Sequence, residues 1–296
     1  MRVVILGCGY VGVELGKQLS AHDVVGVRRS RDGLDAIEDA GLTAIQADIT
    51  DPSSLASVPD ADVLVFAASS GGRDAEAARN IYVEGQRTAI EQFCTREHPP
   101  DRYVYTSSTG VYGDHDGGWV DEETPLDPTT AKAEMLVEAE ECALELPAEY
   151  GIDGTVVRYA GLYGPGRYRL ERYLDGPVTE GYVNLLHRED AAGIVAFLLE
   201  RNLARGETVL GVDNEPVSRW TLADWLASEC GQPDPPKRTV EQRLEDDDLS
   251  ERARRRVLAD KRCSNAYLRE LGYTFEYPTF REGYRFAIES YRDGER

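Results

Sequence analysis

Three glycines, Gly7, Gly9 and Gly12, lie directly after the first short apolar run of the chain, Val3–Leu6. In a strand that turns into a helix, the first glycine of this spacing allows a tight turn, the second lets the backbone approach a pyrophosphate, and the third allows close helix–strand packing. The N-terminus of the following helix then offers free N–H groups to an anion. The spacing therefore predicts a strand–turn–helix unit that binds a dinucleotide; the alternative is a glycine-rich turn with a purely structural role.

The first half of the chain alternates short apolar runs with longer helical patterns. Strands are expected at Val3–Leu6, Val24–Val27, Thr43–Ala47, Val63–Ala67, Arg102–Thr106 and Thr155–Arg158. Helices are expected at Val11–Ser20, Asp32–Ala40, Glu76–Glu97 and Thr130–Glu149. Because buried parallel strands read as continuous apolar runs, this alternation predicts an α/β fold with a doubly wound parallel sheet.

The second half of the chain is less regular. A helix is expected at Asp190–Glu200, with Asp190 as its N-cap. The segment Pro233–Arg256 is rich in proline and then in charge, and we expect it to be exposed. We predict a dinucleotide-binding domain made of residues 1–160 and about 182–205, and a smaller substrate lobe made of residues 161–181 and 206–296.

The charge balance narrows the classes of partner. The 296 residues include 33 Lys and Arg against 54 Asp and Glu, a formal net charge of −21. Such a surface repels nucleic acid and anionic lipid, so a nucleic-acid binder is disfavoured. The composition, with many carboxylates and few lysines, resembles that of proteins from salt-accumulating (halophilic) archaea; the alternative is an ordinary acidic cytosolic protein. The four lysines are Lys17, Lys132, Lys237 and Lys261.

Cysteines and apolar runs indicate the compartment. Five cysteines without a Cys-x-x-Cys pair suggest neither a disulfide framework nor a zinc site. The run Asp246–Asp248 is expected to be a solvated face, and we predict no metal. No apolar run approaches the ~18 residues that a membrane span needs. A cytoplasmic protein that does not bind membranes is expected.

The end of the second expected strand indicates which dinucleotide is bound. NAD-binding proteins usually place an acidic residue there, on the ribose 2′-OH. Here the strand ends in Arg28, Arg29 and Ser30. Because guanidinium groups bind phosphate through a fork of donors, these residues suit a 2′-phosphate and favour NADP over NAD. The alternative is a pair of solvent-facing arginines on an acidic protein.

Further segments resemble those of a known family. They are Asp48 at the end of the third strand, Ala67-Ala68 after the fourth, the serine-bearing segment Ser107–Gly113, the turn Tyr163–Gly166 and the segment His187–Asp190. With the glycine turn, they resemble the extended short-chain dehydrogenases/reductases of the NAD-dependent epimerase/dehydratase family. The resemblance implies a Rossmann-type domain, a small-molecule substrate and a homodimer. It also implies cofactor contacts by Gly7, Gly9, Tyr10, Val11, Gly12, Arg28, Arg29, Ser30, Asp48, Ile49, Ala67, Ala68, Ser107 and Tyr159.

The chain departs from this family at the acid/base pair. Members usually carry Tyr-x-x-x-Lys after the serine segment, but here Thr129 and Ala133 fill these two slots and Lys132 lies one residue short. This pattern resembles the atypical branch. The pair Thr109-Gly110 stands where sugar-nucleotide dehydratases carry Asp-Glu, and Gly161 stands where epimerases often carry Asn. Both departures weaken the case for a sugar-nucleotide substrate.

Three residues are candidates for the missing chemistry. Ser108 fills the catalytic serine slot, Lys132 could reach the nicotinamide ribose, and Tyr112 lies four residues after Ser108. The structural alternatives are a solvated helix lysine and a packing tyrosine. His115 and His187 are weaker candidates, as a loop residue and a structural histidine. We expect an NAD(P)-dependent oxidoreductase or epimerase acting on a sugar, polyol or related hydroxyl or carbonyl carbon. The rival is a non-catalytic NAD(P)-binding sensor or regulatory module.

Overall fold

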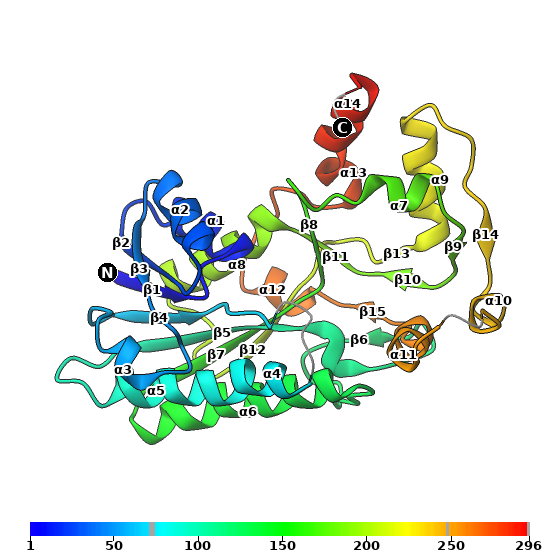
Figure 1. Cartoon of the computed structure of the whole chain (residues 1–296). Helices are drawn as coiled ribbons and strands as arrows, with labels where there is room; N and C mark the ends of the chain where they lie inside the picture. The colour runs from blue at the N-terminus through cyan, green and yellow to red at the C-terminus, as the bar shows by residue number, and fades with distance from the viewer. Residues whose placement is uncertain (71–74, 247–248, 295–296) are drawn as a thin grey trace. The chain divides into compact units, whose positions relative to one another are not determined.

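The computed structural model describes residues 1–70, 75–246 and 249–294 (Figure 1). Its contacts divide the chain into two units. Unit 1 comprises Met1–Val111, Ala131–Tyr159 and Ala191–Val209. Unit 2 comprises Tyr112–Thr130, Ala160–Asp190 and Leu210–Arg296. This division places residues 112–130 and 182–190 in unit 2, whereas the sequence assigns them to the dinucleotide-binding domain.

A seven-stranded sheet in the order β12-β7-β5-β4-β1-β2-β3 forms the centre of unit 1. Its strands are β1 (Arg2–Leu6), β2 (Asp23–Arg28), β3 (Thr43–Gln46), β4 (Val63–Phe66), β5 (Arg102–Ser108), β7 (Asp153–Tyr159) and β12 (Thr208–Gly211). The pairings from β3 across to β7 are parallel. All four residues of β4 are buried, as expected for a central strand covered on both faces. The predicted doubly wound parallel sheet is confirmed.

Helices cover both faces of this sheet. They are α1 (Tyr10–Gln18), α2 (Arg31–Asp39), α3 (Pro52–Leu55), α4 (Ala75–Arg79), α5 (Gly85–Cys94), α6 (Ala131–Glu149) and α8 (Arg188–Glu200). Figure 1 shows α4, α5 and α6 along one face and α1 and α2 along the other. The predicted strands and helices are confirmed within a few residues. The seventh strand, β12, was not predicted, and a π-helical turn, η1 (Asn80–Glu84), interrupts the helix expected over 76–97.

Unit 2 is built from short elements around its own apolar core. Four two-stranded ladders pair β6 (Trp119–Val120) with β15 (Arg262–Cys263), β8 (Gly161–Tyr163) with β11 (Leu185–His187), β9 (Val178–Thr179) with β14 (Lys237–Arg238), and β10 (Tyr182–Val183) with β13 (Val217–Ser218). The helices are η2 (Thr109–Tyr112, which begins in unit 1), α7 (Leu170–Leu174), α9 (Arg219–Glu229), α10 (Val240–Leu244), α11 (Glu251–Leu258), α12 (Ala266–Glu270), α13 (Phe280–Gly283) and α14 (Arg285–Arg292).

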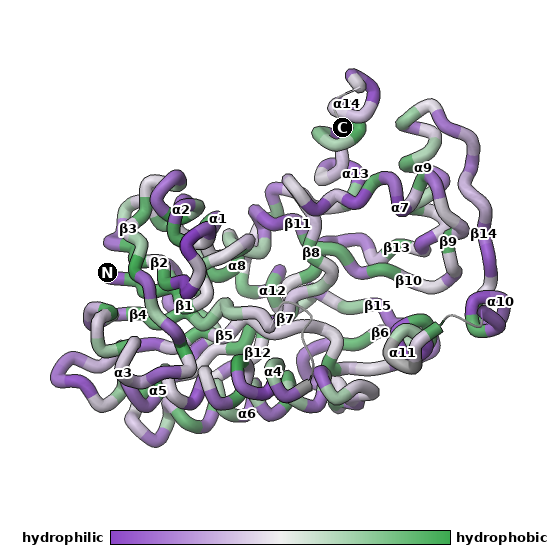
Figure 2. The backbone as a smooth tube through the Cα atoms, in the orientation of Figure 1, coloured by the Kyte–Doolittle hydropathy of each residue, from purple (hydrophilic) through white to green (hydrophobic). Residues whose placement is uncertain are grey.

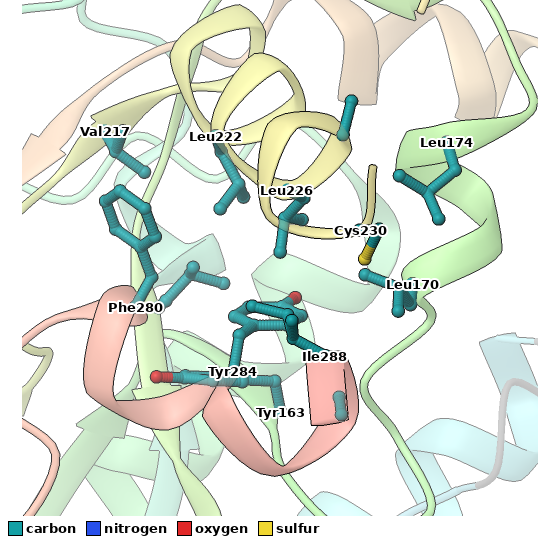
Figure 3. Packing of buried hydrophobic residues seen from close by; sticks show 13 residues of the cluster. Tyr163, Leu170, Leu174, Val217, Leu222, Leu226, Cys230, Phe280, Tyr284 and Ile288 are labelled. Atoms are coloured by element: carbon teal, nitrogen blue, oxygen red, sulfur yellow. The ribbon is translucent and has the colours of Figure 1, made fainter. Parts of the chain in front are cut away.

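Aromatic and aliphatic side chains from α9, α13 and α14 form the core of unit 2 (Figure 3). The rings of Tyr163 and Tyr284 are stacked, with centroids 4.9 Å apart and an interplanar angle of 15°. The Tyr284 hydroxyl donates to the carbonyl of Tyr168 at 3.1 Å. Leu222 and Phe280 are fully buried in the same cluster. This cluster joins stretches of chain that are more than 100 residues apart.

The sequence suggested that Asp190 caps its own helix, but the structure shows that it does not. It lies inside α8, and its buried carboxylate accepts hydrogen bonds from the backbone N–H groups of Glu276 and Tyr277 and from the Tyr273 hydroxyl, each at 2.9 Å. Three donors on one short segment satisfy this carboxylate. The residue therefore anchors residues 273–277 within unit 2.

The segment Pro233–Arg256 was expected to be exposed, and most of its described residues are exposed or half-buried, with Pro235 and Leu249 buried. The segment also contains β14, α10 and most of α11. Figure 2 shows β14 as strongly hydrophilic backbone, whereas α10 mixes hydrophilic and hydrophobic residues. Thr239 and Gln242 form a reciprocal capping box at the start of α10. Asp247 and Asp248 of the predicted acidic face lie outside the described residues. Among the residues that are described, no cluster of three or more His, Cys, Asp or Glu could hold a metal. Within those residues, no helix is both long enough and apolar enough to cross a bilayer.

Candidate functional site

The glycine turn connects β1 to α1 with the geometry that the sequence predicts. Gly7 has a φ of +78°, and a Cβ atom there would lie 2.3 Å from the Cα of Ala68. The backbone N–H groups of Gly7 and Cys8 both donate to the carbonyl of Val27 at 3.1 Å. A Cβ at Gly12 would lie 3.0 Å from Ile5, which confirms the close packing of helix on strand. Because these positions are glycines, they place only backbone atoms beside the start of α1.

A cavity of about 340 Å³ opens beside this turn and is called here the unit 1 cavity. It lies where β1, β2, β3 and β4 end, which is where ligands bind in open α/β sheets. Its lining residues are Gly7, Val27, Arg28, Arg29, Ser30, Ala47, Asp48, Ile49, Thr50, Ala68, Ser69, Ser70, Ala77, Asn80 and Ile81. Seven of these are predicted cofactor residues: Gly7, Arg28, Arg29, Ser30, Asp48, Ile49 and Ala68.

Two arginines enter the unit 1 cavity in different ways. A Cβ at Gly9 would lie 2.5 Å from the Nη1 of Arg28, so this guanidinium lies over the glycine turn. Arg29 instead pairs with Asp48 at 3.2 Å. Burial raises the pKa of Asp48, but hydrogen bonds from Thr50 and the guanidinium of Arg29 outweigh it and hold the pKa below its usual range. Asp48 is therefore ionised at neutral pH and neutralises part of the charge of Arg29.

Other predicted cofactor residues lie apart from this lining. Tyr10, Val11 and Gly12 belong to α1, and Ala67 directly follows β4. The Tyr159 hydroxyl is buried and donates to the carbonyl of Ala191 at 2.6 Å. The buried Ser107 hydroxyl donates to Glu140. These hydroxyls already have partners inside unit 1, and the contact of both residues with a cofactor stays a prediction.

A buried ion pair that the sequence analysis did not predict lies behind Ser107. Arg158 donates to Glu140 from Nη2 at 2.8 Å and from Nε at 3.0 Å. The two side chains are only 7% and 4% exposed. The pair joins β7 to α6 beneath the end of β5, the strand that carries Ser107 and Ser108.

The three catalytic candidates have distinct surroundings. Ser108 is half-buried, and its Oγ accepts from the backbone N–H of Gly110 at 3.2 Å. Lys132 is also half-buried, and its Nζ lies 5.5 Å from the centroid of the Tyr82 ring. Tyr112 belongs to unit 2 and is fully buried, and its hydroxyl donates to the carbonyl of Asp121 at 2.7 Å. This geometry favours the packing role for Tyr112.

The two histidine candidates both lie in unit 2. The Nε2 of His115 is 3.0 Å from the carbonyl oxygen of Tyr112. His187 is buried, and its ring centroid lies 3.7 Å from that of Tyr277. Burial, helped by the nearby charge of Arg188, lowers the pKa of His187 to about 4. His187 is therefore neutral at physiological pH, as the structural interpretation expects.

Unit 2 contains a larger cavity, of about 680 Å³, that the sequence did not reveal. Five arginines line it: Arg172, Arg219, Arg238, Arg243 and Arg256. The acidic residues of its lining are Glu171 and Asp175. We call it the arginine cavity. Its arginines are spread over 84 positions and come from α7, α9, β14, α10 and α11, so no local pattern could have indicated the cluster.

Comparisons with known proteins agree with this geometry. A model of the NAD dependent epimerase/dehydratase family matches residues 3–196. Protein YeeZ of Escherichia coli (strain K12) is 34% identical over 212 residues, which cover 67% of this chain and 73% of YeeZ.

Solved structures match almost the whole chain. A functionally unknown conserved protein from Silicibacter pomeroyi is 29% identical, with a TM-score of 0.77 over 99% of this chain and 98% of its own. The human epimerase family protein SDR39U1, solved with NADPH, is 20% identical, with a TM-score of 0.78 over 98% of this chain and 99% of its own. With the glycine turn and the sheet order described above, these matches make the chain a member of the NAD-dependent epimerase/dehydratase family.

Proposed function

We propose that this chain is an NADP-dependent oxidoreductase that acts on a hydroxyl or carbonyl carbon of a sugar, polyol or related substrate. The observation that carries the proposal is the unit 1 cavity, where Gly7 leaves room for backbone and Arg28, Arg29 and Ser30 offer phosphate donors. When bound, a nicotinamide cofactor would accept or donate a hydride. The residues present fit NADP, because Arg28 lies over the turn that precedes the N-terminus of α1.

Each group of unit 1 would have a separate task in this reaction. The N-terminus of α1 would hold the pyrophosphate, and Arg28 with Ser30 would hold the 2′-phosphate. Ser108 is exposed enough to hydrogen-bond a carbonyl oxygen. The rival, a non-catalytic module, is favoured by the missing Tyr-x-x-x-Lys. Turnover of the cofactor with any member of a carbonyl and alcohol panel would exclude that rival, and tight cofactor binding without turnover would support it.

The cofactor preference is tested by replacing both arginines. We expect the purified chain, titrated in high KCl and followed by nicotinamide fluorescence, to bind NADPH more tightly than NADH. Arg28→Asp combined with Arg29→Ala should reduce this preference by about 10–100-fold, because a hydrogen bond to a charged group contributes roughly 1.5–3 kcal/mol. Arg31→Ala is the control, since Arg31 is exposed at the start of α2 and pairs with Asp35. An unchanged preference would exclude the assigned role, and binding of neither cofactor would overturn the proposal.

The arginine cavity supports a finer proposal, that the substrate carries negative charge. Arg238 and Arg243 share one carboxylate, Asp246, and the half-buried Arg219 donates to the carbonyl of Glu180. Arg172 and Arg256 are exposed at the cavity. Five guanidinium groups outnumber the carboxylates of Glu171, Asp175 and Asp246 at this cavity, and this local excess of positive charge, on a chain with a net charge of −21, favours an anion.

Inorganic pyrophosphate is a suitable probe of this cavity. We expect calorimetry at low salt, with NADPH present at saturation so that the glycine turn is filled, to detect pyrophosphate binding. Arg172→Gln combined with Arg256→Gln should weaken that binding at least about tenfold. Arg201→Gln removes an exposed arginine of unit 1 and serves as the control. Equal binding by the two variants would contradict an anion site in the arginine cavity.

A further inference from the structure

Tyr82 and Lys132 bring a phenol and an ammonium group together in unit 1, although they are 50 positions apart in the sequence. Tyr82 is 5% exposed and lies in the π-turn η1, while Lys132 lies in the first turn of α6. The Nζ of Lys132 is 5.5 Å from the centroid of the Tyr82 ring, within the range of a cation–π contact. The chain has no Tyr-x-x-x-Lys, yet it holds this pair on two separate helices.

The π-turn holds Tyr82 in place. The backbone N–H of Gly85 bonds to the carbonyl of Asn80, five residues back, which widens the helix at this point. The fully buried Gln86 side chain donates to the carbonyl of Tyr82 at 3.2 Å and to that of Ala139 on α6 at 2.7 Å. Single π-turns within α-helices occur frequently at functional sites. Here the turn fixes Tyr82 against the helix that carries Lys132.

The Tyr82 hydroxyl is directed at the edge of the unit 1 cavity. It accepts from the backbone N–H of Ser70 at 3.2 Å and lies 3.4 Å from the Ser70 hydroxyl. Ser69 and Ser70 both line the cavity, as do Asn80 and Ile81 of the π-turn itself. Tyr82 is not part of the lining. The Tyr82 hydroxyl therefore contacts the proposed cofactor site indirectly, through its hydrogen bonds with Ser70 of the cavity lining.

The surroundings of Tyr82 lower the pKa of its hydroxyl. Burial raises the pKa of Tyr82, but hydrogen bonds from Ser70 and Ser69 and the charge of Lys132 outweigh it, and the pKa lies below the usual value of 10. Tyr105, on the neighbouring β5, is buried and neutral, with a pKa well above the usual range. The charged groups of α4, η1 and α6 nearby, Arg79, Glu84 and Glu138, pair with one another. Among the residues that the structure describes, Lys132 is the cation whose charge lowers the pKa of Tyr82, and it adds to the larger effect of the serine hydrogen bonds.

We propose that Tyr82 and Lys132 replace the missing Tyr-x-x-x-Lys pair, as a proton-holding pair behind the Ser69–Ser70 wall of the unit 1 cavity. The inference rests on the proposed function. When a substrate hydroxyl is oxidised, its O–H bond breaks and a new O–H bond forms on the Tyr82 oxygen, with the Ser70 hydroxyl as the intermediate carrier. A bound nicotinamide would take the hydride in a separate transfer. Tyr82 thus accepts the proton through Ser70 without touching the substrate. Lys132 keeps its own proton and stabilises the phenolate.

The test is a tyrosinate titration of the full-length chain, followed by ultraviolet difference absorbance. One tyrosine should ionise before the others. Tyr82→Phe should remove this step, and Lys132→Met should move it to higher pH, while Lys132→Arg should retain it. Tyr284→Phe and Lys17→Met are the matched controls: Tyr284 is a buried tyrosine of unit 2 whose hydroxyl donates to the carbonyl of Tyr168, and Lys17 is exposed on α1. Unfolding curves are measured for each variant to verify that its fold is retained.

The same titration with bound cofactor separates a site residue from a merely structural tyrosine. The positive charge of oxidised nicotinamide should place the early step about 0.5–1.5 pH units lower with NADP⁺ than with NADPH. Equal midpoints with the two cofactors would overturn the inference, as would an early step that survives in Tyr82→Phe. Cofactor binding is read independently from nicotinamide fluorescence. Absence of binding overturns the proposed function itself, whereas binding with an unshifted midpoint overturns only the role of Tyr82 and Lys132.

Discussion

Replacing Glu140 with leucine should lower the free energy of unfolding by about 3–5 kcal/mol, the usual cost of leaving one member of a buried ion pair without its partner. Arg158 would then keep its charge in the interior of unit 1, and Ser107 would lose its acceptor. The pair links α6 to β7, and because its side chains are only 7% and 4% exposed, the guanidinium would be left without water. Urea unfolding at a fixed KCl concentration measures the loss.

The same helix supplies a control for this experiment. Glu138 pairs with Arg79 on the surface, where the two side chains are 40% and 47% exposed, and Glu138→Leu should cost no more than about 1 kcal/mol. Combining Glu140→Leu with Arg158→Met should recover most of the stability, because an apolar pair of similar volume often replaces a buried ion pair without loss. If Glu140→Leu and Glu138→Leu lowered the free energy of unfolding equally, the buried pair would contribute no more to stability than the surface pair, and the prediction would be wrong.

Gly7→Ala should abolish NADPH binding and destabilise the chain by about 2–5 kcal/mol. A non-glycine residue at positive φ costs roughly 1–2 kcal/mol, and the new Cβ would also overlap the backbone of Ala68, which adds about 1–3 kcal/mol. A Cβ is held rigidly by its own backbone, and the atoms that it would overlap are backbone atoms of Ala68. The glycine turn and the end of β4 must therefore move apart. The walls of the unit 1 cavity would move with them. Fluorescence titration with NADPH and urea unfolding measure the two effects.

Gly41 allows the two causes to be separated. It has nearly the same φ, +77°, but a Cβ there meets no atom within 4 Å. Gly41→Ala should therefore show only the conformational cost and bind NADPH as the unmodified chain does. If Gly7→Ala matched Gly41→Ala in both stability and affinity, the contact between Gly7 and Ala68 would have no part in the cofactor site.

The elements that sequence predicted well are those whose signal is local. The apolar run of β4 and the glycine turn each lie within six residues, so spacing and hydrophobicity suffice. The π-turn at Asn80–Glu84 was not predicted because it depends on a side chain, Gln86, that bonds to the neighbouring helix. The helix-capping role of Asp190 was wrong because its donors lie more than 80 residues away.

The candidate site follows the same division. Arg28 and Ser30 could be inferred from their position at the end of one strand. The arginine cavity and the contact of Tyr82 with Lys132 arise only when distant segments meet in three dimensions. Ser107 shows a third case: the family resemblance implies a cofactor contact, which stays a prediction, while its hydroxyl is bonded to a glutamate 33 residues later, which no local pattern could indicate. Only the fold shows which of two adjacent serines faces inward.

The order of the two units along the chain also determines which of them can fold first during synthesis. The last segment of unit 1 ends at Val209, so all of unit 1 is outside the ribosome as soon as Val209 has emerged. The core of unit 2 cannot form until Phe280, Tyr284 and Ile288 have been synthesised. Domains generally fold as units during synthesis, N-terminal first. The nucleotide-binding half could thus be complete, and loaded from the cellular pool, while its companion is still a nascent chain. A ribosome stalled some tens of codons beyond position 209 should already display a folded, ligand-protected fragment.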